Sequence, residues 1–349
     1  MSELQEPLLN GIAMETKLLL HDGTIKFAHQ INPGDILMGD DSTPRHVISV
    51  KKIDASQSKL YKVKQIKGEN YIINRDNYIS LKLSRIRNTK TNSLKINENE
   101  YTKDTVVDIR LSDYIALNNT TQLDFKGYKV AVDFKVDTLI FDPYIIGIWL
   151  VDASTLSTNE ITISDPLILY ECFEILQKYD MKLEFVKGNR YSINYENSSR
   201  KFNDILTSLN LIDCKCIPSV YKINSRENRM KLLAGIIDCE GFFNNNCYEL
   251  TVKDEKLVDD IVFLCNSLGF YTSKSVQKNT HYYRLIISGN LTDIPVFDPR
   301  KKMSERKQIK NILHTGIKIE PLSDVNMSLE FTIDGNGRFL TSDFTVIHS

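Results

Sequence analysis

The sequence predicts a multidomain chain in which an all-β domain is split by an inserted α+β domain with pseudo-twofold symmetry. Short apolar segments of period 2, separated by turn residues, fill about residues 14–135 and return near the end of the chain. Between them, "ITISDPLILYECFEIL" (161–176) matches "LTVKDEKLVDDIVFLC" (250–265) at an offset of 89 residues, each a strand followed by a helix. A duplicated unit flanked by two strand-rich segments is the arrangement expected of an insertion.

We divide the chain at the points where the pattern changes. Residues 1–10 are an N-terminal extension, 11–138 form the first part of the β domain, 139–310 the inserted domain and 311–349 the last part of the β domain. The inserted domain contains repeats at about 140–225 and 226–310. A chain of 349 residues is long enough for two or three cores, which agrees with this division.

The amino-acid composition excludes several classes of protein. The formal net charge is -1, so any contact with nucleic acid must use local basic surfaces. Six cysteines lack C-x-x-C spacing and neighbouring histidines, which favours reduced thiols over a zinc site or disulfides. No apolar run approaches a membrane span, and the N-terminus lacks a signal-peptide pattern. We expect an intracellular protein without membrane contact, nuclear in a eukaryote and cytoplasmic otherwise.

Turn chemistry defines the elements of the β domain. "HDGT" (21–24) and "GDDSTP" (39–44) separate alternating apolar segments. Residues 86–104 are polar and predict an exposed loop. The last 21 residues, "LEFTIDGNGRFLTSDFTVIHS", predict a hairpin that turns at residues 334–337.

Each repeat of the inserted domain contains helix-end signals. Asp165 and Asp254 stand at the expected N-caps, Pro166 at a first helical position and Gly269 at a C-terminal cap. Strand-rich tracts follow at 181–195 and 270–288. One element upstream of each repeat, "IIGIWLVDAS" (145–154) and "LLAGIIDCEG" (232–241) are apolar helices that end on acids.

The acid-ended helices predict a shared site. One interpretation is a pair of buried helices with polar ends. The other is that Gly147, Ala234 and Gly235 let the two helices pack closely, so that Asp152 and Asp238 meet at their ends. Two such carboxylates require cations between them, and hard oxygen ligands favour Mg²⁺, which can activate water for phosphodiester hydrolysis. We interpret Glu240 as a solvated residue, because it has no matching acid in the first copy.

These motifs resemble the duplicated signature of the two-repeat LAGLIDADG homing endonucleases, over about residues 140–310. The resemblance implies a monomeric nuclease that cuts double-stranded DNA at a long specific target, with Mg²⁺ or Mn²⁺ as cofactor. It assigns the metal and catalysis to Asp152 and Asp238. It assigns catalytic assistance to Lys215 in "KCIP", and a second basic role to Lys301 or Lys302.

The same resemblance implies that the strand-rich tracts contact DNA in the major groove, where alternate side chains read base edges. For the lysines, phosphate contact is the more natural role. The candidate DNA-binding residues are Lys187, Arg190, Lys274, Lys278, Arg284, Arg300 and Lys302.

The flanking β segments resemble the Hint domain of inteins, the protein-splicing fold. "GIAMETKLLLHDGTIK", "GENYIINRDNYISL" and "GRFLTSDFTVIHS" match its N-terminal, internal and C-terminal blocks. Splicing needs a Cys or Ser nucleophile, a block histidine and a final Asn. The corresponding positions are degenerate: Gly11 at the first residue, Asn74 and Asn77 in the block, and His348 followed by Ser349 at the end.

We therefore expect an intein-derived, site-specific DNA endonuclease that does not splice. One alternative is an intein precursor whose splicing was blocked by engineering. Another is a DNA-binding protein that has lost cleavage, since Val151 and Ala153 flank Asp152 where relatives usually have glycine.

Overall fold

The chain forms two compact units, each described here by itself. Unit 1 contains Met1–Val132 and Leu313–Ser349, and unit 2 contains Asp133–Ile312. The computed structural model describes residues 10–54, 59–87, 91–96, 98–152, 159–196, 202–212, 214–278, 281–304, 311–322 and 327–349. Most of the N-terminal extension, Ala153 and the end of the basic segment 299–310 lie outside the described residues.

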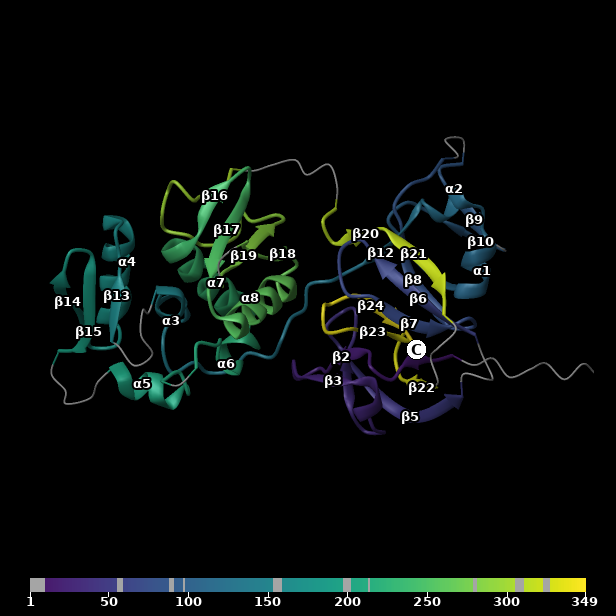
Figure 1. Ribbon diagram of the computed structural model, residues 1–349, viewed down its shortest axis with the longest axis horizontal. Helices are drawn as coiled ribbons and strands as arrows, with labels where there is room; N and C mark the ends of the chain where they lie inside the picture. The colour runs from purple at the N-terminus through teal and green to yellow at the C-terminus, as the bar shows by residue number, and fades with distance from the viewer. Residues whose placement is uncertain are drawn as a thin grey trace, which may run out of the picture. The chain divides into compact units, whose positions relative to one another are not determined.

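Unit 1 is built mainly of short strands (Figure 1). Before unit 2 its elements are β1 Ile12–Ala13, β2 Lys17–Leu19, β3 Ile25–Phe27, the 3₁₀ helix η1 Ala28–Gln30, β4 Ile36–Met38, β5 Pro44–Asp54, β6 Leu60–Gln65, β7 Tyr71–Asn74, β8 Tyr78–Leu83, β9 Leu94–Ile96, β10 Asn99–Tyr101, β11 Val106–Arg110, α1 Leu111–Ala116, α2 Asn119–Gln122 and β12 Phe125–Tyr128. After unit 2 they are β20 His314–Thr315, β21 Ile317–Pro321, β22 Met327–Ile333, β23 Arg338–Leu340 and β24 Val346–His348.

The largest sheet of unit 1 combines both parts of the chain. Its strand order is β21-β6-β7-β1-β22-β5-β4, so β22 lies between β1 and β5. A second sheet, β11-β8-β12-β20, also joins the two segments. Alternating apolar side chains of these strands, including Ile12, Val63, Leu81 and Phe331, form one buried core.

Two predictions for unit 1 are wrong. The expected C-terminal hairpin does not form, because β22 pairs with β1 and β5 whereas β23 pairs with β24. A turn does lie at 334–337, where Gly335 and Gly337 have φ of 74° and 75°. The expected loop at 86–104 contains a hairpin of β9 and β10, in which Lys95 pairs with Glu100.

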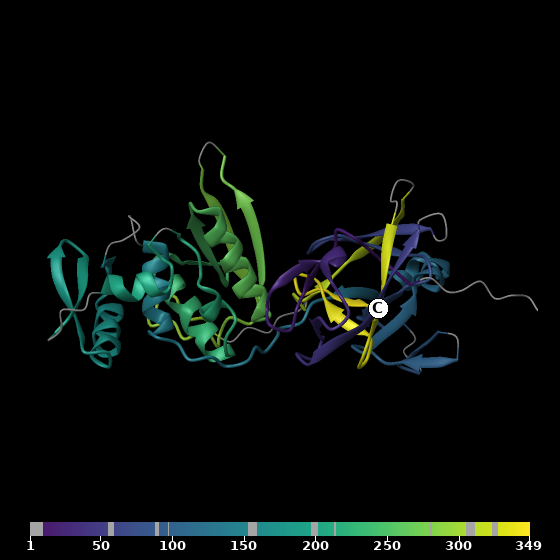
Figure 2. The ribbon, with the colours of Figure 1, turned by 90° about the horizontal axis from the view of Figure 1, so that it is seen from below.

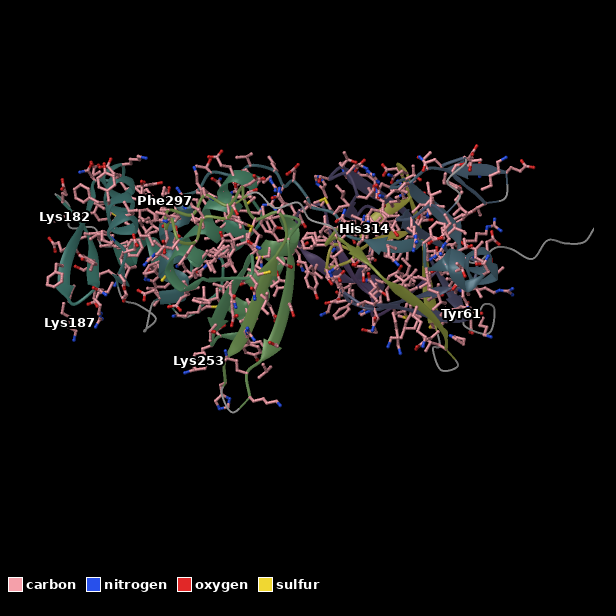
Figure 3. All side chains as sticks on the ribbon, turned by 90° about the horizontal axis from the view of Figure 1, so that it is seen from above. Tyr61, Lys182, Lys187, Lys253, Phe297 and His314 are labelled. Atoms are coloured by element: carbon pink, nitrogen blue, oxygen red, sulfur yellow. The ribbon has the colours of Figure 1, made fainter. Side chains whose placement is uncertain are left out.

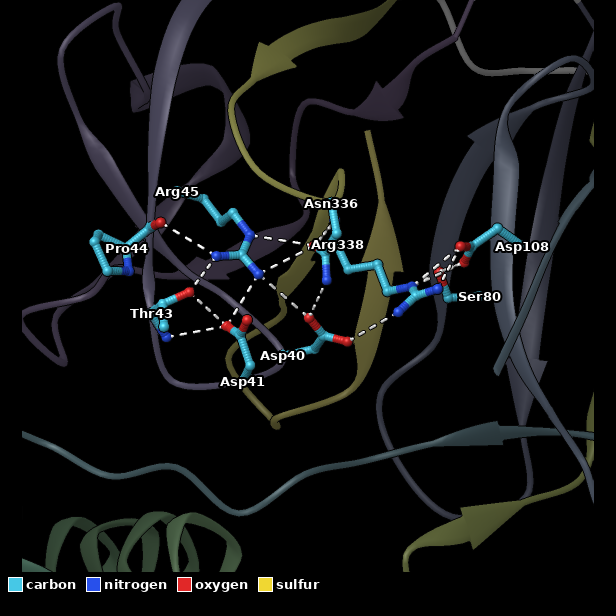
Figure 4. Close-up of polar contacts among 9 residues, drawn as sticks. All are labelled: Asp40, Asp41, Thr43, Pro44, Arg45, Ser80, Asp108, Asn336 and Arg338. Carbon is cyan, nitrogen blue, oxygen red and sulfur yellow. Dashed lines mark hydrogen bonds and ion pairs between the residues drawn. The ribbon is translucent and has the colours of Figure 1, made fainter. Parts of the chain in front are cut away.

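A polar network holds the turn before β23 against the first part of unit 1 (Figure 4). The Arg45 guanidinium, 4% exposed, donates to Asp41 at 2.9 Å and to Asn336 at 3.1 Å. Arg338 donates to both oxygens of Asp108, with Nη2 2.6 Å from Oδ2. Because the arginine fork matches a carboxylate, these contacts fix the register between segments that are far apart in the sequence.

Unit 2 contains two α/β repeats. The first contains α3 Pro143–Asp152, β13 Glu160–Thr162, α4 Pro166–Gln177, β14 Met181–Lys187, β15 Arg190–Tyr195 and α5 Phe202–Ser208. The second contains α6 Ser219–Lys222, α7 Arg226–Glu240, β16 Phe242–Asn244, β17 Cys247–Val252, α8 Glu255–Ser267, β18 Tyr271–Val276 and β19 Tyr283–Ser288.

Each repeat places a helix against one face of an antiparallel sheet. The first sheet has the order β13-β15-β14 and packs against α4; the second has the order β16-β17-β19-β18 and packs against α8 (Figure 2). The predicted N-caps are confirmed: Asp165 accepts from the Leu167 N–H at 2.9 Å and Asp254 from the Leu257 N–H at 3.0 Å. One core, with the fully buried Trp149, runs through both repeats.

All six cysteines are free thiols. Within the described parts of the chain, every helix is too short or too polar to cross a membrane.

Candidate active site

Helices α3 and α7 cross in direct backbone contact at two glycines. A Cβ at Gly235 would lie 2.1 Å from the Tyr144 carbonyl oxygen, and one at Gly147 would lie 2.3 Å from the Leu232 carbonyl oxygen. Only glycine permits such an approach. The close packing predicted from the small residues is therefore present in the structure.

The crossing explains why these helices lack a polar face. In α3 the side chains from Pro143 to Leu150 are all buried, and in α7 the buried run extends from Leu232 to Asp238. Beyond their contact with each other, α3 packs against β13, and α7 packs against α6, α8 and β17. A helix enclosed on all sides is apolar all round, as the sequence shows.

Where α3 and α7 end, beyond their crossing, three side chains that could bind a metal ion lie close together. One ligand atom each from Asp152, Cys239 and Glu240 lies within 4.8 Å of the others. Asp152 accepts a hydrogen bond from the Thr162 N–H, which fixes its carboxylate. Burial raises the pKa of Asp152, and partial burial together with Asp152 raises the pKa of Glu240.

Asp238 does not occupy this cluster, which corrects the predicted pairing. Its carboxylate is 3% exposed and accepts from the Tyr144 hydroxyl at 2.8 Å, the Phe297 N–H at 2.7 Å and the Asp298 N–H at 3.3 Å. Burial raises its pKa, and these donors oppose the rise. Asp238 thus anchors residues 297–298 to α7. Glu240 occupies the position beside Asp152 that was predicted for Asp238.

The helical repeat explains the difference. Successive residues turn by about 100°, so Asp238 and Glu240 point to opposite sides of α7. Asp152 stands five residues after Gly147, and Glu240 stands five residues after Gly235. Because the two glycines meet at the crossing, the residues at equal distances beyond them meet at its end. The count depends on the contact of Gly147 with Gly235, which sets the register of α3 against α7 and which the pairing of aspartate with aspartate does not use.

Lys215 lies beside the cluster. It shares with Glu240 and Val151 the lining of a cleft of about 680 Å³. Burial lowers the pKa of Lys215, and the neighbouring Asp152 opposes this shift. The loop that carries it is fixed by the Asp260 carboxylate, which accepts from the Ile217 N–H at 2.9 Å. A lysine with a lowered pKa, held near two carboxylates, is suited to proton transfer.

Lys301 has a different position from the one its predicted catalytic role requires. Its ammonium donates to the carbonyl oxygens of Ile237 at 2.9 Å and Asp238 at 2.7 Å. Burial lowers its pKa, and Asp238 opposes the shift. A cation at the C-terminal end of a helix satisfies unpaired carbonyls and complements the helix dipole. Lys301 is therefore a cap of α7.

The electrostatics of the cluster favour a cation. Both α3 and α7 end here; Lys301 complements the dipole of α7, and α3 contributes the negative end of its own helix dipole. Two carboxylates and the C-terminal end of α3 at short distance repel one another unless a positive charge lies between them. Carboxylate oxygens are ligands that Mg²⁺ and Mn²⁺ accept, so the residues present fit such an ion.

The predicted DNA-binding residues within the strands do not all lie on the same type of sheet face. Arg190 and Arg284 lie on the sheet faces away from the helices. Lys274 lies on the opposite face, where it forms ion pairs with Asp259 at 2.6 Å and Glu255 at 3.4 Å of α8, so a role in DNA contact is not favoured.

The remaining four are exposed. Lys187 ends β14 (Figure 3), and Lys278 follows β18. Arg300 forms ion pairs with Asp165 and Asp298, and Lys302 lies near it in the chain.

The degenerate splicing positions are close together in unit 1. The Gly11 carbonyl accepts from the Asn74 N–H at 2.9 Å and from Asn77 Nδ2 at 3.3 Å. The ring of His348 lies 5.4 Å from that of Tyr78, the residue after Asn77. Ser349 donates its N–H to the Gly337 carbonyl at 2.9 Å.

Comparison with known proteins identifies the region around the second acid-ended helix. Residues 227–293 match the LAGLIDADG-like domain family. The matched residues include Gly235 and Glu240 of α7 and the whole second sheet.

Other similarities cover a larger share of the chain. The chain is 24% identical over 149 residues to the replicative DNA helicase DnaB of Mycobacterium intracellulare, a match that spans 42% of this chain and only 22% of the helicase. Among solved structures, mesophilic variants of the homing endonuclease I-DmoI are 19% identical, with a TM-score of 0.34 over 42% of this chain and 87% of that one. The gp41-1 intein is 17% identical, with a TM-score of 0.18 over 29% of this chain and 80% of that one.

Proposed function

We propose that the chain is a metal-dependent, site-specific endonuclease for double-stranded DNA, with Asp152 and Glu240 as the metal ligands. The observation that supports this most is the meeting of their carboxylates at the joint end of two helices in backbone contact. The LAGLIDADG-like domain, which contains Glu240, supports the same class of enzyme. Because one chain supplies both acids, we propose that it acts as a monomer.

The residues of the cluster have separate roles in this proposal. A bound Mg²⁺ or Mn²⁺ would supply a water of lowered pKa and would stabilise charge on the leaving oxygen. Asp152 and Glu240 hold the ion, and the Thr162 N–H keeps the Asp152 carboxylate oriented. Lys215 holds or transfers a proton at Nζ beside the scissile phosphate. Asp238 and Lys301 keep the end of α7 in place and touch no reacting group.

A cleavage assay on a plasmid library with random inserts, in Mg²⁺, tests the proposal. We expect the unmodified chain to cut a specific subset of inserts. Asp152→Asn and Glu240→Gln should each lower the cleavage rate by about 100-fold or more, while DNA binding persists. Glu227→Gln provides a matched control, since Glu227 lies in the same helix and pairs with Lys231 on the surface. Equal cleavage by Glu240→Gln and the unmodified chain would refute the assignment.

For unit 1 we propose an intein origin without present splicing activity. Gly11 lacks a nucleophile, and a Cβ there would lie 2.6 Å from Ser328 Oγ and 2.8 Å from Asn74 Oδ1, so these two side-chain ends would have to shift to admit one. The unmodified chain should give no excised product on a gel. The triple change Gly11→Cys, Asn77→His and Ser349→Asn tests the ancestry, and recovery of splicing would support it.

A further inference from the structure

An arginine–glutamate pair lies on the open face of the first sheet. Arg190 Nη2 contacts Glu160 Oε2 across β15 and β13. In the strand register Glu160 lies opposite Ser192. Arg190 is therefore two residues before the residue that faces Glu160. Both side chains are partly exposed, at 39% for Arg190 and 27% for Glu160.

The second sheet contains the same pair at the same register. Arg284 Nη2 lies 2.6 Å from Glu249 Oε2, and its Nε contacts the other oxygen. Glu249 is opposite Ile286, so this arginine too stands two residues before the glutamate's partner. The glutamates, Glu160 and Glu249, are 89 residues apart, which is the offset of the repeat. The two pairs are therefore related by the internal symmetry of unit 2.

Both pairs point away from the helices that cover the sheets. In the first sheet the alternate residues Ile161 and Ile193 are buried on the α4 side. In the second, Leu250 and Leu285 are buried on the α8 side. Because side chains alternate along a strand, the arginines project from the opposite, open faces.

We propose that Arg190 and Arg284 each read one guanine, at symmetry-related positions in the two halves of the DNA target, while the paired glutamate orients each guanidinium, through one contact at Arg190 and two at Arg284. This inference rests on the proposed function and names a feature of its substrate. It also assigns Glu160 and Glu249 as positioning residues.

The donor geometry of Arg284 supports a base contact. Glu249 occupies the N–H of Nε and one N–H of Nη2, which leaves Nη1 and the second N–H of Nη2 along the outer edge. That edge matches the O6 and N7 acceptors of guanine in the major groove. Adenine presents a donor in place of O6, so the same edge discriminates against it.

The charge of the pairs favours bases over phosphates. An arginine bound to a glutamate has little net charge, so the pair gains little from a phosphate and brings a carboxylate close to it. A lysine on a DNA-facing sheet instead favours contact with phosphates over contact with bases. Paired arginines on both open faces thus indicate sequence readout at two matched positions.

Selection from random duplexes by the full chain in Ca²⁺, followed by sequencing of the bound fraction, tests the inference. We expect two preferred guanines, one in each half-site and equally distant from the centre. Arg284→Lys should lower the preference for one guanine by about 10- to 100-fold, and Arg190→Lys the other, because lysine keeps the charge but cannot make the paired contact. Glu249→Gln should weaken the same preference as Arg284→Lys by a smaller factor.

Lys182→Gln is the matched control, because Lys182 forms an ion pair with Glu184 on the first sheet but has no planar fork. It should lower affinity uniformly and leave base preferences unchanged. If Arg284→Lys and Arg190→Lys also lower affinity uniformly, or leave the selected sequence unchanged, the inference is wrong although the chain binds specific DNA. If the unmodified chain selects no sequence, the proposed function fails as well.

Discussion

Replacing Gly235 with alanine is expected to force α3 and α7 apart and so to separate the carboxylates of Asp152 and Glu240. The new Cβ would lie 2.1 Å from the Tyr144 carbonyl oxygen, where side-chain Cβ atoms essentially never come within 3.0 Å. The contacting atom is backbone, so a side-chain rotation cannot relieve the overlap. The helices must move by about 0.9 Å at this point.

Two magnitudes follow from this displacement. Overpacking of this kind costs about 1–3 kcal/mol, which for a unit of this size lowers the melting temperature by about 2–12 °C. A displacement of about 1 Å between catalytic groups lowers a rate by about 100-fold. The cleavage rate should therefore fall far more than the loss of folded protein can explain.

The assay combines thermal unfolding, followed by circular dichroism, with single-turnover cleavage well below the melting temperature. Ala234→Gly is the matched control: it weakens α7 by about 1 kcal/mol through helix propensity but adds no atom to the crossing. It should lower the melting temperature and leave cleavage nearly unchanged. A Gly235→Ala protein with an unaltered melting temperature and cleavage rate would show that the helices do not meet as described.

Three further predictions concern single contacts. Tyr144→Phe removes the hydroxyl donor to Asp238 and should reduce the free energy of unfolding by about 1–3 kcal/mol, measured by urea titration. Lys301→Met leaves the last carbonyls of α7 without their donor, so amide hydrogen exchange should accelerate at that helix end while distant helices stay protected. Burial alone would raise the pKa of Asp343, but the Lys129 ammonium at 2.8 Å and other donors hold it below its ordinary value. Its contribution to stability is therefore present above about pH 4 and is lost as the pH falls through the lower folded-state pKa, and Asp343→Asn should flatten this part of the stability profile.

Local signals were read correctly from the sequence, because their chemistry is contained within a few residues. Asp165 and Asp254 cap α4 and α8 as predicted, since a short acceptor before a helix satisfies its first N–H groups in any context. The two acid-ended helices were predictable for the same reason. Each depends on the residue types in one short segment.

Features that depend on distant partners were not predictable in this way. The partners of β22 lie in the first part of the chain, so the turn at 334–337 does not by itself show that β22 pairs with the strand after it. The face occupied by Lys274 follows from the burial of Thr272, a polar residue that does not mark a core position. The partner of Asp152 required the register of α3 against α7, and an anchored aspartate resembles a metal-binding one in composition.

The central position of β22 in the larger sheet of unit 1 has a consequence for synthesis of the chain. β5 ends at Asp54 and β22 begins at Met327, so 272 residues separate strands that must pair. At a translation rate of about 5–20 residues per second, the edge of β5 that pairs with β22 stays unpaired for roughly 14–54 s, and the corresponding edge of β1 for longer. Unit 2 is continuous in sequence and can fold during that interval. During synthesis, the first strands to leave the ribosome thus belong to the last unit to be completed.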